Sequence, residues 1–386
     1  MKCRSVRSAN VKGKRVLVTA ELNVARDRAG RVVDDSRIRA VIPTLKLLQK
    51  RRAKIVLATH LGRPGGRVVS ALRTKVLAPL LRRALGRQVT ALSDCIGPPV
   101  EAAVKKMNAG EIVLLENTRF YPGEERNSPS FAKALSRLAD VFVLESFGSA
   151  HRRHASIVGV GKYLPSYAGL QLCAEVSTLS KVLGQPQRPL VALLGGAKIS
   201  TKLGIISSLL RRVDNLLLGG ALANTILQAQ GLQIGRSLSE PAMVRKVKAL
   251  HLTDPKLHIP VDLVVARPTG RPVIRAAGAV RPGEVISDIG PDTIKLFQNI
   301  LTTARTVVWN GPMGKYERRP YDGGTKAMGR AVASSRAFSV VGGGETVDAL
   351  RSQRLLNQVD FISTGGGAMI EFLEGRKLPG VELVRQ

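Results

Sequence analysis

Short runs of apolar, often β-branched residues alternate with amphipathic stretches along the whole chain. In the first half these runs lie at residues 15–20, 54–59, 111–116 and 141–145. Between the first two, residues 38–48 place apolar side chains at helical spacing. Continuous apolar strands separated by amphipathic helices are typical of a parallel sheet that is covered on both faces. We therefore predict an α/β protein.

A second series of the same kind fills the other half of the chain. It follows residues 184–189, whose Gly and Pro content indicates a break. The segment 171–185 has helical periodicity and is expected to form a connecting helix. We predict two doubly wound parallel-sheet (Rossmann-like) domains, residues 1–170 and 186–372, joined by this helical hinge. A cleft between two such domains is a common place for a ligand.

Five predicted strands in the second half run directly into glycine. The junctions are Leu194-Gly195-Gly196, Leu218-Gly219-Gly220, Asn310-Gly311, Val341-Gly342-Gly343-Gly344 and Thr364-Gly365-Gly366-Gly367. A glycine-rich strand end followed by a helix points backbone N–H groups and a helix N-terminus at one spot, where an anion is stabilised. Such glycines also occur simply to pack a turn. Their repetition predicts a sheet whose carboxyl edge binds a phosphate-rich ligand.

Basic and polar side chains follow the strands of the first half. They are Asn23, Arg37, His60, Arg63, Arg119 and Arg152. The carboxyl ends of parallel strands share one edge, where arginines can hold a phosphate or carboxylate in bidentate fashion. A single arginine would more simply be a solvated surface charge. Four arginines and a histidine at successive strand ends instead favour an anion site.

The remaining motifs, present and absent, limit the classes of reaction that the chain could catalyse. The sequence has no Walker-type phosphate loop and no G-x-S-x-G elbow, and no serine or cysteine stands out as a nucleophile. His151 and His154 lack a third metal ligand nearby in sequence. Lys198 and Lys202 are spaced one helical turn apart after Gly195-Gly196. Anion sites in both halves plus two lysines are suited to phosphoryl transfer by positioning and charge stabilisation, without a covalent intermediate.

Composition adds one unusual feature, the charge. The 386 residues include 60 Lys and Arg against 28 Asp and Glu, a formal net charge of +32. Such a charge suits nucleic-acid binding, but the basic residues are spread along the chain and aromatic residues are only 4%. No apolar run approaches the ~18 residues of a membrane span, and we expect no signal peptide. Three cysteines far apart in sequence favour a reducing, cytoplasmic compartment.

Several long motifs resemble those of one enzyme family. From about residue 5 to its end, the chain is similar to the phosphoglycerate kinases of bacterial type, and the resemblance rests on the motifs DDSRIR (34–39), HLGRP (60–64), LENTRF (115–120), FGSAHR (147–152), GGAK (195–198), VWNGP (308–312) and STGGG (363–367). It implies reversible phosphoryl transfer between 1,3-bisphosphoglycerate and ADP, giving 3-phosphoglycerate and MgATP. The first domain would hold the glycerate and the second the nucleotide, with closure about the hinge excluding water.

The resemblance also assigns residues. It implies Arg37, Lys198 and Lys202 as catalytic groups. The implied glycerate-binding set is Glu21, Asn23, Arg37, His60, Leu61, Gly62, Arg63, Arg119 and Arg152. The implied nucleotide-binding set is Gly196, Ala197, Lys198, Lys202, Asn310, Glu317, Gly343, Gly344, Glu345 and Thr346, with Glu345 beside the Mg²⁺ of the nucleotide. A cytoplasmic monomer is expected, with a tail of about residues 373–386 packed on the first domain.

The chain departs from the family pattern at several positions. The family has Asp where this chain has Glu21, Glu145 and Glu345, usually Arg at Thr19, Gly at Ala221 and an apolar residue at Lys315. An added methylene moves a carboxylate by roughly 1.5 Å, enough to cost about 10²-fold where geometry is critical. These changes and the net charge leave open a second interpretation: a catalytically weakened homologue that serves as a basic binding or structural subunit of a nucleoprotein assembly.

Overall fold

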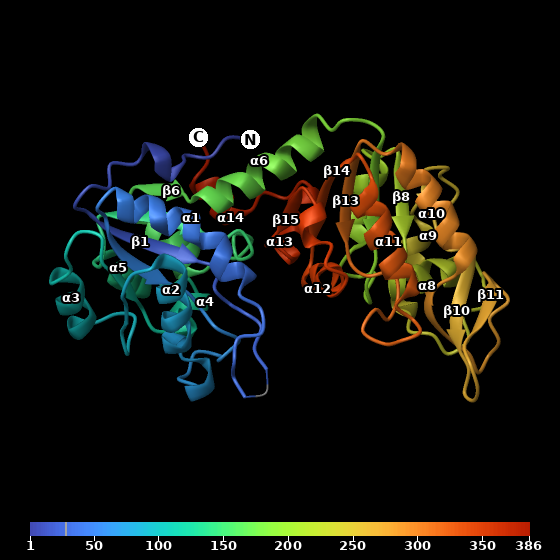
Figure 1. The fold of residues 1–386 in the computed structure, drawn as a ribbon, viewed down its shortest axis with the longest axis horizontal. Coiled ribbons are helices and arrows are strands. Elements are labelled where there is room, and N and C mark those ends of the chain that lie inside the picture. The colour runs from blue at the N-terminus through green and yellow to red at the C-terminus, as the bar shows by residue number, and fades with distance from the viewer. Residues whose placement is uncertain (28) are drawn as a thin grey trace. The chain divides into compact units, whose positions relative to one another are not determined.

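The computed structural model describes residues 1–27 and 29–386 (Figure 1). The chain divides into two compact units. The first comprises Met1–Ser180 together with Lys377–Gln386, and the second comprises Lys181–Arg376. Each unit is built around its own six-stranded parallel sheet, which confirms the predicted fold class.

The sheet of the first unit has the strand order β3-β4-β2-β1-β5-β6. Its strands are β1 (Arg15–Ala20), β2 (Lys54–Ala58), β3 (Val89–Ala91), β4 (Ile112–Leu114), β5 (Val141–Glu145) and β6 (Ser166–Ala168). The four strands predicted from apolar runs are the four central ones, whose residues are almost entirely buried. The two edge strands are only three residues long and gave no clear apolar run.

Helices pack on this sheet through their apolar stripes. They are α1 (Ser36–Lys50), α2 (Ala78–Leu85), α3 (Pro98–Lys105), α4 (Pro122–Glu125), α5 (Pro129–Ser136), α6 (Leu170–Gly184) and α14 (Pro379–Leu383). α1 buries Ile38, Leu45 and Leu48 in one core cluster with residues of β1 and β2. At its start the Asp34 carboxylate accepts hydrogen bonds from the N–H and hydroxyl of Ser36 at 3.0 and 2.9 Å.

The two ends of the chain lie side by side in the first unit (Figure 1). The N–H of Arg4 donates to the carbonyl of Val384 at 2.7 Å, and the N–H of Ala168 donates to the carbonyl of Arg4 at 2.7 Å. The N-terminal segment is therefore hydrogen-bonded to the C-terminal residues on one side and to β6 on the other.

The sheet of the second unit has the order β15-β14-β13-β7-β8-β9. Its strands are β7 (Leu190–Leu194), β8 (Asn215–Leu218), β9 (Leu257–His258), β13 (Thr306–Asn310), β14 (Phe338–Gly342) and β15 (Phe361–Ser363). The five strands that run into glycine are contiguous neighbours and parallel, as predicted. The helices are α7 (Leu203–Leu210), α8 (Gly220–Ala229), α9 (Val244–Lys248), α10 (Pro291–Thr303), α11 (Gly323–Ser334), α12 (Gly344–Ser352) and α13 (Gly367–Leu373).

A three-stranded antiparallel sheet in the second unit was not anticipated from the sequence. It consists of β11 (Val273–Ala276), β10 (Asp262–Ala266) and β12 (Val285–Ile289), in that order. β10 and β12 bury Leu263, Val265 and Ile286 against α8 in a small core of their own. Within the described residues, no helix is both long and apolar enough to cross a membrane.

Candidate functional site

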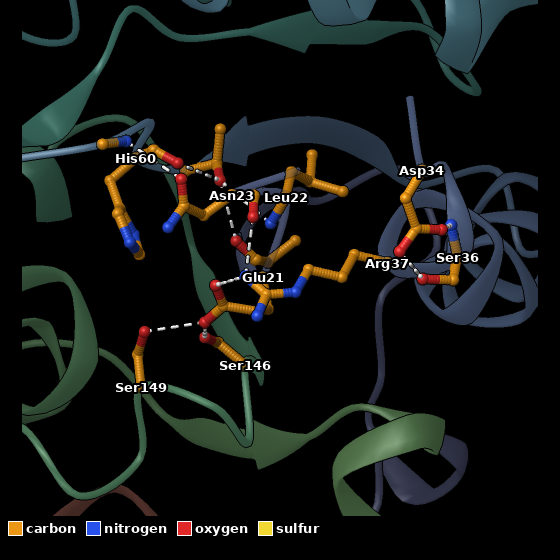
Figure 2. Close-up of polar contacts among 12 residues, drawn as sticks. Glu21, Leu22, Asn23, Asp34, Ser36, Arg37, His60, Ser146 and Ser149 are labelled. Carbon is orange, nitrogen blue, oxygen red and sulfur yellow. Dashed lines mark hydrogen bonds and ion pairs between the residues drawn. The ribbon is translucent and has the colours of Figure 1, made fainter. Parts of the chain in front are cut away.

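A buried carboxylate organises the strand ends of the first unit. Glu21 directly follows β1 and is only 6% exposed. Its Oε1 accepts from Nη1 of Arg37 at 3.1 Å, and its Oε2 accepts from the hydroxyls of Ser146 at 2.9 Å and Ser149 at 2.7 Å (Figure 2). Burial raises the pKa of Glu21, but its interactions with His60 and Arg37 and the hydrogen bonds from the two hydroxyls outweigh the effect of burial and leave the pKa lowered. Glu21 is therefore an anion that fixes Arg37.

Hydrogen bonds bring further predicted residues to the same edge. Arg37 also donates from Nη1 to the carbonyl of Asn23 at 2.6 Å. The side-chain Oδ1 of Asn23 accepts from the N–H of Gly62 at 2.9 Å (Figure 2). Nη1 of Arg119 donates to the carbonyl of Gly62 at 3.0 Å. Leu61, between His60 and Gly62, is fully buried and anchors this loop in the core.

His60 and Arg119 lie beside charged side chains of both signs. Burial, reinforced by the charges of Arg119, His154 and Arg37, lowers the pKa of His60 to about 4 despite the opposing effect of Glu21. His60 is thus neutral near pH 7 and can donate a hydrogen bond from one ring nitrogen. Burial also lowers the pKa of Arg119 and outweighs the opposing charges of Glu125, Glu124 and Glu21, while Arg152 adds to the lowering.

Arg63 and Arg152 are the two remaining residues of the predicted glycerate-binding set. Both are exposed, and the charge of Arg152 acts on Arg119. The sequence argument missed Ser146 and Ser149 as ligands of Glu21, although the run after β5 contains both. It also missed Glu125, whose Oε1 lies 3.5 Å from Nε of Arg119.

Glu145, one of the family departures, points elsewhere. It ends β5 and is 2% exposed. Its carboxylate accepts from the hydroxyl of Thr44 in α1 and from the N–H groups of Gln171 at 3.1 Å and Leu172 at 3.0 Å. Burial outweighs these hydrogen bonds and raises its pKa to about 7. Glu145 therefore caps the N-terminus of α6, the helix that continues into the second unit.

Lys202 is the most constrained predicted residue of the second unit. It is 8% exposed, and its ammonium donates to the carbonyl of Gly195 at 2.6 Å, the carbonyl of Asn310 at 3.1 Å and Oδ1 of Asn310 at 2.8 Å. Burial lowers its pKa to about 8, against the opposing effect of Glu345. Lys202 therefore ties the ends of β7 and β13 together.

The helical relation expected between Lys198 and Lys202 was wrong. Both lysines lie in the loop before α7, which begins at Leu203. Lys198 is exposed, whereas the side chain of Lys202 is buried and donates to the carbonyl of Gly195, the residue that follows β7. The ammonium groups therefore occupy different environments, and only that of Lys198 is open to solvent.

Asn310 links the third strand end to this group. Its Nδ2 donates to the carbonyl of Gly342 at 3.0 Å, and the next residue, Gly311, donates its N–H to the hydroxyl of Thr346 at 2.7 Å. Gly343 precedes α12 with φ of 95°, a conformation that requires glycine. The predicted Gly343, Gly344 and Thr346 thus form the positive end of a helix beside the strand ends.

A cavity of about 260 Å³ opens next to these loops. Four of the predicted nucleotide-site residues line it, Gly196, Ala197, Glu317 and Glu345, together with Ala221. The rest of the lining is largely apolar and comes partly from the antiparallel sheet, with Leu238, Pro260, Leu263 and Met313. An apolar pocket with a few polar groups at its edge is typical of small-molecule sites. These apolar residues are scattered along the chain, so no local sequence signal marks them.

Glu345 is the candidate ligand for a metal that accompanies phosphates. It is exposed, lies in the first turn of α12 and lines the cavity. Among the described residues, no group of three or more His, Cys, Asp or Glu could hold a metal ion. A single carboxylate plus phosphate oxygens and waters is how Mg²⁺ is usually bound with nucleotides. The site therefore fits Mg²⁺ carried in by a nucleotide and does not fit a permanent all-protein metal site.

Comparison with known proteins identifies the family. A model of the phosphoglycerate kinase family matches residues 6–376. The chain belongs to the phosphoglycerate kinase family. It is 46% identical over 384 residues to the phosphoglycerate kinase of Moorella thermoacetica, covering 98% of each chain. It is 45% identical over 391 residues to that of Thermomicrobium roseum, covering 99% of each.

Solved structures agree. The structure of the phosphoglycerate kinase from Coxiella burnetii matches with a TM-score of 0.87 and 36% identity, covering 99% of this chain and 98% of the other. Phosphoglycerate kinases use MgATP. The structure accommodates two departures from the family pattern without a strained backbone or an unpaired carboxylate. Ala221 lies inside α8 and needs no positive φ, and the long side chain of Glu21 fits between Arg37 and two serines.

Proposed function

We propose that this chain is an active phosphoglycerate kinase. The observation that carries the proposal is the pair of anion sites. The first unit presents Arg37, Arg119 and neutral His60 at one sheet edge. The second presents a lysine-bearing glycine loop and a helix N-terminus beside a cavity of about 260 Å³. Full-length relatedness to phosphoglycerate kinases supports the same reaction.

In the first unit, the 3-phosphate of the glycerate would bind to Arg63, Arg119 and Arg152. Three guanidinium groups together carry more positive charge than a phosphate dianion carries negative charge, and their bidentate hydrogen bonds orient it. Asn23 and His60 would hold the glycerate hydroxyl and carboxyl. Since Glu21 is already saturated by Arg37 and two serine hydroxyls, its role is to position Arg37.

Arg37 would meet the reacting end of the glycerate. It is half-buried and is held by Glu21 and the carbonyl of Asn23. Because this guanidinium is held in place before the reaction, it does not have to reorganise when negative charge develops on the transferred phosphoryl group. It can therefore stabilise that charge at little cost in free energy. The carboxylate of 3-phosphoglycerate attacks the γ-phosphorus of ATP, the bond to the β-phosphate oxygen breaks, and ADP leaves.

In the second unit, the nucleotide base would enter the cavity, with Glu317 accepting from the ribose. Backbone N–H groups at Gly343 and Gly344 and the exposed ammonium of Lys198 would bind the phosphates. Mg²⁺, when bound with the nucleotide, neutralises phosphate charge, and Glu345 would hold it directly or through water. Lys202, which ties two strand ends together, would keep the glycine loop in shape and add a buried positive charge.

Substrate analogues test the assignment. Full-length protein is assayed for MgATP-dependent ADP formation with 3-phosphoglycerate and with glycerate that lacks the phosphate. We expect turnover with 3-phosphoglycerate and a loss of at least about 10³-fold in kcat/KM without the phosphate, because several charge-assisted contacts disappear. Equal activity with both compounds would remove the arginines from substrate binding.

A further inference from the structure

Two of the three cysteines meet at the edge of the first unit. Cys3 lies on the N-terminal segment, and Cys173 lies in the first turn of α6. The two thiols are close enough for each to shift the pKa of the other. Both side chains are partly exposed, so small molecules in solution can reach them, whereas Cys95 is fully buried. Neither cysteine is among the residues assigned to the reaction above.

Backbone hydrogen bonds hold the two cysteines in place. The carbonyl of Arg4, next to Cys3, accepts from the N–H of Ala168 at 2.7 Å. The thiol of Cys173 lies 3.9 Å from the carbonyl oxygen of the same Ala168. Ser5 also pairs with Ala168 in a parallel bridge. Contacts of one residue of β6, Ala168, therefore bring the backbone beside Cys3 and the thiol of Cys173 to the same place.

The surroundings distinguish the two thiols. The hydrogen bond from Cys3, helped by that from Ser5 and by the charge of Arg7, lowers the pKa of Cys173, although burial and Glu145 act against it. The same hydrogen bond and burial raise the pKa of Cys3. Because the thiolate is the nucleophile, Cys173 is the attacking residue and Cys3 the resolving one.

We propose that Cys3 and Cys173 form a redox-active dithiol that closes to an intramolecular disulfide by exchange with a low-molecular-weight disulfide. The Cys173 thiolate attacks one sulfur of that disulfide, forming a mixed disulfide and releasing one thiolate. Cys3 then loses its proton and attacks the sulfur of Cys173, which releases the second thiolate. Each released thiolate takes up a proton, so the external disulfide is reduced to two thiols while the protein pair is oxidised.

The bond would join distant parts of the chain. It would fix the first turn of α6, which continues into the second unit, to the N-terminal segment. Closing so long a loop stabilises the folded state mainly by restricting the unfolded chain. For a chain of this size we expect the melting temperature to rise by roughly 5 °C.

The test uses the full chain treated with oxidised or reduced glutathione. After oxidation, alkylation and peptide mapping by mass spectrometry under non-reducing conditions should show Cys3 linked to Cys173, with the rise in Tm reversed by dithiothreitol. Cys3→Ser should instead trap Cys173 as a mixed disulfide with glutathione and show no rise. Cys95→Ala, the matched control, should keep both the link and the rise.

Other outcomes would overturn the proposal. These are two thiols that remain open to alkylation after oxidation, a glutathione adduct on each cysteine of the unaltered chain, or a disulfide between two chains. The expected turnover of the reduced protein is unchanged in Cys3→Ser, because neither cysteine contacts the substrate or nucleotide residues. Loss of that turnover would also contradict the assignment.

Discussion

Replacing Lys202 by methionine should change how stability depends on pH. The side chain is 8% exposed, and burial lowers its pKa from 10.5 to about 8. This difference corresponds to about 3 kcal/mol of free energy of unfolding. Between pH 8 and 10.5 the unfolded chain keeps the proton that the folded protein releases, so the contribution of Lys202 to stability rises with pH and is lost as pH falls through 8.

The measurement is the free energy of unfolding in urea, for parent and Lys202→Met, from pH 7 to pH 10.5. The parent-minus-variant difference should rise by about 3 kcal/mol across this range. At pH 7, removal of the ammonium leaves the carbonyl of Gly195 and Oδ1 of Asn310 without a donor, whereas the carbonyl of Asn310 keeps its hydrogen bond from the N–H of Gly195. That loss, at about 1–3 kcal/mol per group, competes with relief of the buried charge.

Lys198→Met is the matched control, because this exposed lysine of the same loop stays in water in both states. Its difference from the parent should be flat with pH. Turnover of Lys202→Met should fall by about 10²–10³-fold at pH 7, since a preorganised charge near the phosphates is lost. A flat pH profile for Lys202→Met would refute the buried ammonium, and unchanged turnover would remove Lys202 from catalysis.

Four further predictions concern other residues and the net charge. Glu345→Ala should weaken MgATP binding in a magnesium-dependent way, whereas Glu345→Asp should raise nucleotide affinity or turnover modestly. The measurement is steady-state kinetics across a magnesium titration. Identical curves for the alanine variant and the parent would exclude a metal role for Glu345. Arg119→Lys should raise KM for 3-phosphoglycerate about tenfold or more and leave KM for MgATP unchanged, because lysine cannot bind a phosphate in bidentate fashion. Thr44→Val should lower the free energy of unfolding by about 1–3 kcal/mol in urea titrations, since the hydroxyl donates to Glu145 and accepts from the N–H of Leu170. RNA binding, measured by fluorescence anisotropy, should lack sequence preference and vanish as salt rises; nanomolar binding at physiological salt would favour the nucleoprotein-subunit interpretation.

The central strands could be predicted because their signal is local. β13, Thr306–Asn310, is buried at every position and runs into glycine, so its own residues identify it as an interior strand of a parallel sheet. β11, Val273–Ala276, alternates between half-buried and exposed residues and exists only through antiparallel pairing with β10. The four residues of β11 do not by themselves reveal that partner, so the sequence did not predict the small sheet. The apolar lining that this sheet gives to the cavity was missed for the same reason.

The features of the candidate site also separate into those that local sequence predicts and those that depend on tertiary contacts. Arginines at strand ends follow from the order of residues, since parallel strands share an edge. The environment of Lys202 does not, because its acceptors include Asn310, which is 108 residues away in sequence. Glu145 was one of the departures that left reduced activity open, yet its carboxylate caps α6. The meeting of Cys3 and Cys173 likewise depends on tertiary contacts and leaves no trace in local sequence.

The most direct test of the central claim is ATP formation by the purified chain from 1,3-bisphosphoglycerate and MgADP. The geometry predicts turnover in the ordinary enzymatic range of about 1–10³ s⁻¹, abolished when either substrate is omitted. No ATP above the blank, from protein whose circular dichroism and cooperative unfolding show that it is folded, would contradict the claim.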